Sequence, residues 1–327
     1  MTDENPSTPG ASGANGRPAH WERDLLERLA FASLTEQRRA RRWGIFFKLF
    51  FAAYLVLLLL IAMSDEWGTK ALATRHTALI DMEGVISADS LANADNIISG
   101  LRAAFENKAT QGIVLRANSP GGSPVQAGYI YDEIRRLRTK HPKIPLYAVI
   151  GDVCASGCYY AVAAADKIYA DKASVVGSIG VLMNGFGFVD TMKKLGVERR
   201  LMTAGEHKGF LDAFAPLKPA EVKHAQQLLD EIHRQFIDTV RQGRGEALKE
   251  TRDMFSGLFW TGEEAIRLGL VDSLGGASYV AREVIGAEDI VDYTYRENVF
   301  DRFARRLGTA MAQTLGTDLF GRTPLLK

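Results

Sequence analysis

Beyond the first 75 residues, hydrophobic and polar positions alternate in blocks that predict strands separated by helices. The apolar runs "TALIDMEGVI" (77–86), "QGIVLRANSPGG" (111–122) and "IPLYAVIGDV" (144–153) have the length and composition of strands. Residues 90–108 and 125–140 instead repeat apolar residues at helical spacing. Strands separated by helices of this length predict a parallel sheet with helices on its faces.

Two further apolar segments follow these blocks. Residues 151–170, "GDVCASGCYYAVAAADKIYA", are a glycine turn, a serine among small residues and then a long helix-like run. Residues 219–245 predict a long amphipathic helix. Its expected apolar stripe consists of Leu228, Leu229, Ile232, Phe236, Ile237 and Val240. No internal repeat is present, so we expect one copy of the folded unit.

The N-terminal part predicts a membrane anchor. Residues 45–63, "IFFKLFFAAYLVLLLLIAM", contain one charge, Lys48, and would span about 28 Å as a helix, close to the hydrocarbon thickness of a bilayer. The preceding "QRRARRW" (37–43) places the N-terminus in the cytoplasm by the positive-inside rule, and the rest of the chain across the membrane. A cleaved signal peptide and a buried core helix are the alternatives. The long polar segment before the apolar run argues against a signal peptide. The uniform apolarity of the run argues against a buried core helix.

Composition narrows the function further. The formal net charge is +1, so no global field favours a nucleic-acid partner. Two cysteines, Cys154 and Cys158, are too few for a disulfide framework, and we interpret them as small packing residues, with their redox state left open. We expect no metal ion and no cofactor.

Candidate chemistry lies at two glycine-rich strand exits, "NSPGG" (118–122) and "GDVCASG" (151–157). In open α/β sheets ligands bind at the carboxyl ends of strands. Ser156 would stand at a helix start, where free backbone N–H groups stabilise a developing oxyanion. The alternative is that Ser156 is a plain helix N-cap.

A serine nucleophile needs a base. Of the six histidines, His207 is the one in a loop that could reach, and no carboxylate is clearly placed to complete a triad. A lysine base must be desolvated, because its ordinary pKa of ~10.4 keeps it charged at pH 7. Lys208, in "TAGEHKGFLDAFAP" (203–216), has small and apolar residues after it and is the lysine candidate.

Taken together, five motifs resemble the signal peptide peptidase A family of membrane-bound serine peptidases, in its single-repeat form. The resemblance covers roughly residues 76–290, in the family's order. The motifs are "NSPGG", "ASGCYYAVAAADKIYA", "SVVGSIGV", "GEHKGFLDAFAP" and "FWTGEEAIRLGLVDSLGG". The resemblance implies an α/β, crotonase-like (Clp protease-like) fold and a Ser-Lys dyad.

Carried over by motif, the nucleophile is Ser156 and the general base is Lys208. The oxyanion donors would be the backbone N–H groups of Gly157 and Gly122, and the Ser178 hydroxyl would orient the lysine amine. This chain departs from the family in one respect, because a cysteine follows the "SG" pair where glycine is usual.

The resemblance also implies partners and substrates. It predicts a homo-oligomeric ring in which one subunit's lysine completes its neighbour's site, and hydrophobic peptides, chiefly signal-peptide remnants, as substrates. The alternatives are other membrane-protein substrates, an acyl-CoA hydratase or isomerase on the same scaffold, and a non-catalytic membrane scaffold.

The expected organisation places the peptidase domain outside the cytoplasm, periplasmic in a cell with two membranes. The expected segments are a cytoplasmic tail (1–44, disordered and then a charged helix), an anchor (45–63), a linker (64–75), the peptidase domain (76–292) and a C-terminal extension (293–327).

Overall fold

The computed structural model describes residues 21–67 and 75–296, without the side chains of residues 21–26, 28–30, 32–35 and 59–67. The chain divides into two compact units, Met1–Lys70 and Ala71–Lys327. The expected disordered tail over residues 1–20 and most of the C-terminal extension, residues 297–327, lie outside the described residues.

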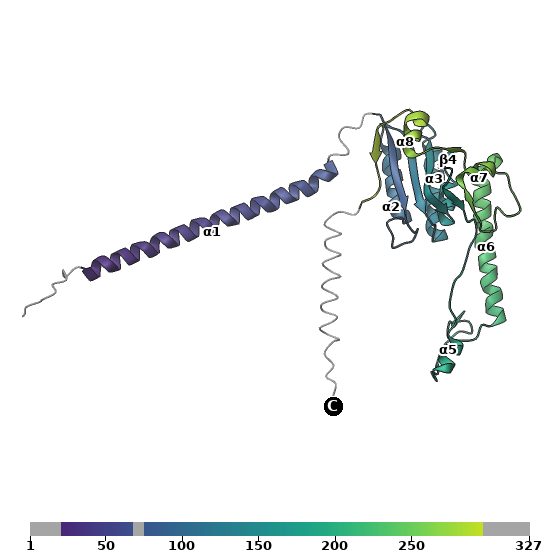
Figure 1. Cartoon of the computed structure of the whole chain (residues 1–327), viewed down its shortest axis with the longest axis horizontal. Helices are drawn as coiled ribbons and strands as arrows, with labels where there is room; N and C mark the ends of the chain where they lie inside the picture. The colour runs from purple at the N-terminus through teal and green to yellow at the C-terminus, as the bar shows by residue number, and fades with distance from the viewer. Residues whose placement is uncertain (1–20, 68–74, 297–327) are drawn as a thin grey trace, which may run out of the picture. The chain divides into compact units, whose positions relative to one another are not determined.

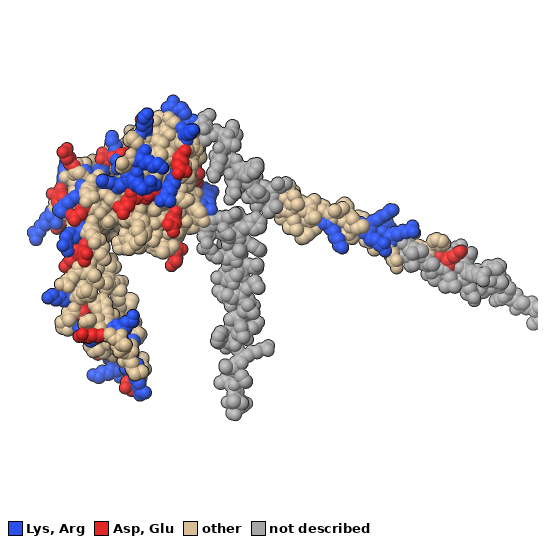
Figure 2. All heavy atoms as spheres, turned by 180° about the vertical axis from the view of Figure 1, so that it is seen from behind, with Lys and Arg blue, Asp and Glu red and all other residues tan. Residues whose placement is uncertain are grey.

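The described residues of the first unit form a long helix, α1 (Trp21–Trp67), which includes the basic segment, the predicted anchor and the first residues of the expected linker. Figure 2 shows the basic cluster of α1 beside an uncharged stretch. In the described part of α1, no stretch is both long and apolar enough to cross a membrane. The side chains of residues 59–63 of the predicted anchor lie outside the described ones.

The second unit is built on a mostly parallel sheet, as the sequence predicts (Figure 1). Within the described residues, the strand order is β6-β5-β3-β2-β1-β8, and β4 pairs with both β3 and β7. Strand β6 is antiparallel to β5, whereas the other neighbours run parallel. The strands are β1 (His76–Glu83), β2 (Thr110–Ser119), β3 (Leu146–Ala155), β4 (Lys167–Ala170), β5 (Val175–Gly177), β6 (Phe259–Thr261), β7 (Ser273–Leu274) and β8 (Ile290–Asp292).

Helices cover both faces of this sheet. They are α2 (Ala94–Glu106), α3 (Pro124–Lys140), α4 (Gly157–Val162), α5 (Val189–Lys194), α6 (Pro219–Arg244), α7 (Gly262–Arg267) and α8 (Ala277–Tyr279), with the 3₁₀ helix η1 (Gly245–Ala247) and the π-helix η2 (Val280–Ile285). Alternate residues of the central strands belong to two different clusters: Ile80 and Leu115 pack with α2 and α3, whereas Leu79 and Val114 pack with Val280 of η2. The period of two in the strands therefore supplies both core layers.

Strand β3 is divided by an irregularity that directs its last residues toward the candidate site. Its first half pairs with β4 and its second half with β5. Between the two halves the register against β2 shifts, so that Asn118 of β2 lies opposite three residues of β3. The Asn118 side chain accepts a hydrogen bond from Val153 N (3.1 Å), and Ser174 Oγ donates to Gly151 O (2.6 Å). These side chains satisfy backbone groups that the interrupted ladder leaves unpaired.

Residues 180–218, which we call the arm, connect the region after β5 to α6 and include α5. Figure 1 shows α5 beside the end of α6 that is far from the sheet. Helix α6 itself was predicted, but only the last part of its expected stripe is buried: Phe236 and Val240 are core residues, whereas Leu228 is 39% exposed. Leu91, which belongs to the helical segment predicted over residues 90–108, instead precedes α2 and is exposed.

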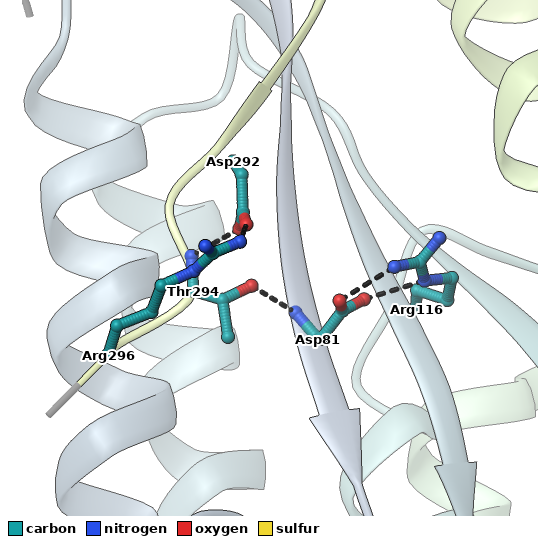
Figure 3. A network of polar contacts seen from close by, with 5 residues as sticks. All are labelled: Asp81, Arg116, Asp292, Thr294 and Arg296. Atoms are coloured by element: carbon teal, nitrogen blue, oxygen red, sulfur yellow. Dashed lines mark hydrogen bonds and ion pairs between the residues drawn. The ribbon is translucent and has the colours of Figure 1, made fainter. Parts of the chain in front are cut away.

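The opposite edge of the sheet is closed by a polar network (Figure 3). Arg116 donates from two nitrogens to the carboxylate of Asp81 (2.6 Å each), and the Asp81 backbone N–H donates to Thr294 Oγ1 (2.9 Å). Asp292 accepts from Thr294 N (2.8 Å) and from Arg296 (2.5 Å). This network fastens the end of β8 to β1 and β2.

Candidate functional site

The two glycine-rich strand exits meet in space. A Cβ atom on Gly121 would lie 2.7 Å from Gly157 N and 2.8 Å from Ser156 Cβ, and one on Gly157 would lie 3.2 Å from Gly122 N. The turn after β2 therefore contacts the backbone around Ser156 directly, and a side chain at Gly121 would not fit. The sequence places both loops at strand ends, and the parallel pairing of β2 with β3 brings those ends together.

Ser156 stands at the N-cap position of α4, but its side chain makes no capping hydrogen bond. Ser156 therefore does not act as a plain N-cap, and the Ser156 hydroxyl is available for other chemistry. The expected long helix is also shorter than predicted: α4 has 6 residues, and the end of the apolar run forms β4. A six-residue helix contributes only its terminal N–H groups here, with little macrodipole.

The backbone conformation marks the same loops. Among the described residues, three that are not glycine have φ in the left-handed region: Ser156 (53°), Ser178 (49°) and Leu211 (49°). Such conformations cost about 1–3 kcal/mol each and concentrate at functional sites. Two of the three are predicted site residues, and the third lies in the loop of Lys208.

Two amide groups beside Ser156 are free to donate. Among the described residues, neither Gly122 N–H nor Gly157 N–H has a hydrogen-bond acceptor, whereas Gly121 N–H donates to Ser119 Oγ (3.1 Å). Gly157 is the first residue of α4, so its N–H has no partner within the helix. Free donors next to a serine hydroxyl are what an oxyanion site requires.

Cys154 and Cys158 are fully buried in the core, in agreement with their interpretation as packing residues. Their redox state, which the sequence leaves open, is that of a disulfide, with their Cα atoms 5.2 Å apart. The bond joins the end of β3 to the first turn of α4 and encloses Ser156.

Strand β5 places Ser178 next to the serine loop. Ser156 N–H donates to Gly177 O (2.9 Å), and Ser178 N–H donates to Leu258 O (2.8 Å). The Trp260 ring lies against Gly177, where an added Cβ would be 2.9 Å from the indole. The buried Trp260 Nε1 has no hydrogen-bond partner among the described residues.

His233 of α6, which the sequence analysis does not select as a site residue, lies beside the Ser178 segment in the structure. Its Nε2 lies 3.2 Å from Ile179 O, one residue after Ser178. Its spacing of three and seven from the buried Phe236 and Val240 puts it on their face of α6, and this spacing is the signal that could have identified it.

Lys208 is not brought to Ser156 within the chain. Its side chain is exposed, and among the described residues no hydrogen bond or ion pair joins the two. Its loop rests on the N-terminal half of α6, where the Phe210 ring contacts that of His224 (5.7 Å), whereas Ile179 contacts His233. Nine residues separate these two contacts, which is about 14 Å along a helix.

The buried hydroxyl group of Tyr159 holds helix α4 in place. Tyr159 is fully buried, and its hydroxyl donates to Leu270 O (2.8 Å). Burial raises the pKa of Tyr159, so the hydroxyl remains a neutral donor. Nearby, the buried Arg244 donates to both oxygens of Asp272 (2.9 and 3.0 Å) and to Gly269 O (2.9 Å). These contacts fix the helix that follows the serine.

Comparison with known proteins identifies a family that this chain resembles. The model of Peptidase family S49 matches residues 138–289, which include Ser156, Ser178 and Lys208. "Putative protease slr0021" of Synechocystis sp. is 31% identical over 209 residues, covering 64% of this chain and 73% of that protein. "Putative signal peptide peptidase SppA" of Enterococcus faecium is 28% identical over 227 residues, covering 68% and 65%.

A more similar sequence belongs to a larger protein. "Na(+)/H(+) antiporter NhaA" of Brucella abortus is 45% identical over 186 residues, which are 57% of this chain but 25% of that protein. The chain thus spans about a quarter of the length of this relative.

Proposed function

Because the chain belongs to peptidase family S49, we propose that it is a serine endopeptidase whose nucleophile is Ser156 and whose general base is Lys208. The observation that supports this most is the contact between the two glycine-rich loops, which leaves a serine hydroxyl and two amide N–H groups free side by side. Family membership also favours this activity over an acyl-CoA hydratase.

In the proposed reaction, the neutral amine of Lys208 takes the proton from Ser156 Oγ, which attacks the scissile carbonyl carbon. The amides of Gly122 and Gly157 donate to the oxyanion of the tetrahedral intermediate. The protonated lysine then gives its proton to the leaving amine, and water hydrolyses the acyl-enzyme. Ser178 is proposed to hold the lysine amine in position.

The lysine is proposed to come from a neighbouring copy of the chain in a ring. The separation of about 14 Å along α6 argues against pairing within one chain. The arm also exposes large apolar side chains, which a second copy would cover. They are Leu182, Met183, Phe186, Phe188, Leu195, Val197, Leu201, Met202, Phe214 and Leu217. Burial among such residues would desolvate a lysine amine and favour its neutral form.

We also propose a single-pass anchor at residues 45–63, a cytoplasmic N-terminus and an extracytoplasmic peptidase domain. The arginines before residue 45 support this orientation. The Cys154–Cys158 disulfide supports it too, because disulfides persist in oxidising compartments outside the cytoplasm. Hydrophobic peptides left in the membrane, such as signal-peptide remnants, are the proposed substrates.

The test is hydrolysis of a fluorogenic apolar peptide by the full chain purified in detergent. Ser156→Ala and Lys208→Ala should each lower kcat by about a thousandfold or more, as loss of a nucleophile or its base does in serine peptidases. His207→Ala and the arm variant Lys193→Ala are the controls and should keep normal turnover. Near-normal turnover in either of the first two variants refutes the pair.

Sharing between subunits is tested by mixing. Co-expressed Ser156→Ala and Lys208→Ala chains should regain activity that neither has alone, since some interfaces then combine an intact serine with an intact lysine. Absence of recovery in a mixed oligomer, verified by two different affinity tags, would contradict the shared site. Orientation is tested by protease accessibility of the folded domain in spheroplasts, where a shielded domain would contradict the assignment.

A further inference from the structure

A covalent bond encloses the candidate nucleophile. Cys154 and Cys158 are four positions apart, with Ser156 midway between them, and their disulfide closes a ring of five residues. No other part of the described chain carries such a cross-link. The disulfide therefore constrains the segment 154–158, and the backbone conformation of this segment sets the direction of the Ser156 hydroxyl.

The two ends of this ring are held in different ways. Cys154 pairs with Ser119 of β2 and with Val176 of β5, so sheet neighbours hold it on both sides. Cys158 belongs to α4, a helix of six residues that is held by side-chain packing and by the hydrogen bond from Tyr159 to Leu270 O. The disulfide adds a covalent link between this helix and the strand, across Ser156.

The backbone of Ser156 has a conformation that is unfavourable for any residue with a Cβ atom. Its φ of 53° lies in the region that favours glycine. Two backbone hydrogen bonds hold it, from Ser156 N to Gly177 O (2.9 Å) and from Tyr160 N to Ser156 O (3.0 Å). A residue in this region persists only when its surroundings determine it from several sides.

We propose that the Cys154–Cys158 disulfide is a positioning element for the nucleophile: it holds the Ser156 backbone in its active conformation, so that rapid acylation requires the bond to be closed. This inference rests on the proposed role of Ser156. It adds that activity depends on the oxidation state of this pair and that the two cysteines act through Ser156 without touching the substrate.

The first test is the double variant Cys154→Ala/Cys158→Ala, which keeps both positions small and apolar. Its kcat should fall between roughly tenfold and a hundredfold, as expected for a misplacement of the nucleophile by up to 1 Å, while KM changes less than about twofold. Labelling of Ser156 by a fluorophosphonate should slow by the same factor per folded molecule. An unchanged kcat overturns the proposal.

A control separates positioning from general stability. Ile97→Val removes one buried methyl group on α2, remote from the serine loop, and should lower Tm by a few degrees while leaving kcat unchanged. If Ile97→Val lowers kcat as much as the double variant does, the cross-link has no specific effect on Ser156 and the proposal is wrong.

A second measurement uses the unmodified protein and does not depend on the variant folding. A dithiol such as dithiothreitol gives two electrons and two protons to the cysteine sulfurs and becomes a cyclic disulfide. Because both sulfurs are buried, reduction is carried out under mild denaturant and followed by mass after thiol alkylation of a sample. Refolded, reduced enzyme should lose activity and regain it with oxidised glutathione. Full activity in the reduced form overturns the proposal.

Failure of this inference is distinguishable from failure of the proposed function. If the fluorophosphonate labels Ser156 and Ser156→Ala is inactive, but the double variant works normally, only the role of the disulfide is refuted. If Ser156→Ala retains activity, the proposed nucleophile is wrong and the disulfide has no nucleophile to position.

Discussion

Gly121→Ala adds one methyl group at the point where the two glycine-rich loops touch. The new Cβ would lie 2.6 Å from Ala155 O, 2.7 Å from Gly157 N and 2.8 Å from Ser156 Cβ. The first two atoms belong to the backbone and the third is fixed to it, so no flexible side chain can move aside. To reach an ordinary contact of 3.4 Å, the two loops must separate by about 0.8 Å.

This displacement sets the expected magnitude. A misplacement of about 1 Å costs around a hundredfold in rate, and loss of one oxyanion donor costs a hundred- to a thousandfold. We expect Gly121→Ala to lower kcat by about a hundredfold, which is about 2.7 kcal/mol of transition-state stabilisation. The variant should also lose about 1–2 kcal/mol of stability because an alanine at φ 98° is strained, and about 1–3 kcal/mol from overpacking.

Gly84→Ala is the matched control. Gly84 has a φ of 84°, so alanine there is strained in the same way, but an added Cβ has nothing within 4 Å. It should lose the conformational 1–2 kcal/mol alone and keep its kcat within about twofold. Urea unfolding gives the stabilities, and peptide hydrolysis per folded molecule gives kcat. Equal kcat values for the two variants would refute the argument that the loop contact sets the geometry of Ser156.

Two further predictions concern groups away from the serine. Arg136 and Arg102 lower the pKa of Glu133 to about 2 by hydrogen bonding and charge. The resulting stabilisation is complete above the ordinary pKa and is lost as pH falls towards 2, so Glu133→Gln should cost about 1–2 kcal/mol in urea unfolding at pH 7 and less than half of that at pH 3. A pH-independent cost would contradict it. Tyr159→Phe leaves the buried Leu270 carbonyl unpaired and should cost about 1–2 kcal/mol, or a few degrees in Tm; an unchanged Tm would show that this hydrogen bond contributes nothing.

Local patterns predicted the framework correctly, since each element carries its own signal. The strands of the central sheet are apolar runs of strand length, and the helical spacing over residues 125–140 coincides with α3. The meeting of the two loops also follows from the sequence, because neighbouring parallel strands end at one edge of a sheet.

The length of α4 could not be read in the same way. Residues 157–170 are nearly all buried, so apolar residues stand at almost every position. Their pattern therefore shows neither the period of a helix nor that of a strand. The redox state of the two cysteines was left open for a related reason. Whether they can bond depends on where the strand ends and the helix begins, and the structure puts Cys154 in a strand and Cys158 in a helix.

Of the candidate site, the position of Lys208 is the part that local sequence patterns predict least well. The serine and its neighbouring amides are fixed by strands that pair within the chain, whereas the lysine belongs to an arm whose apolar side chains are exposed in the single chain. A lysine surrounded by water keeps its proton at neutral pH and cannot act as a base. If Lys208 is the base, the arm must therefore be covered in the active state, and the surface that covers it must bring an intact Ser156 within reach. We propose that a second copy of the chain meets both conditions at once.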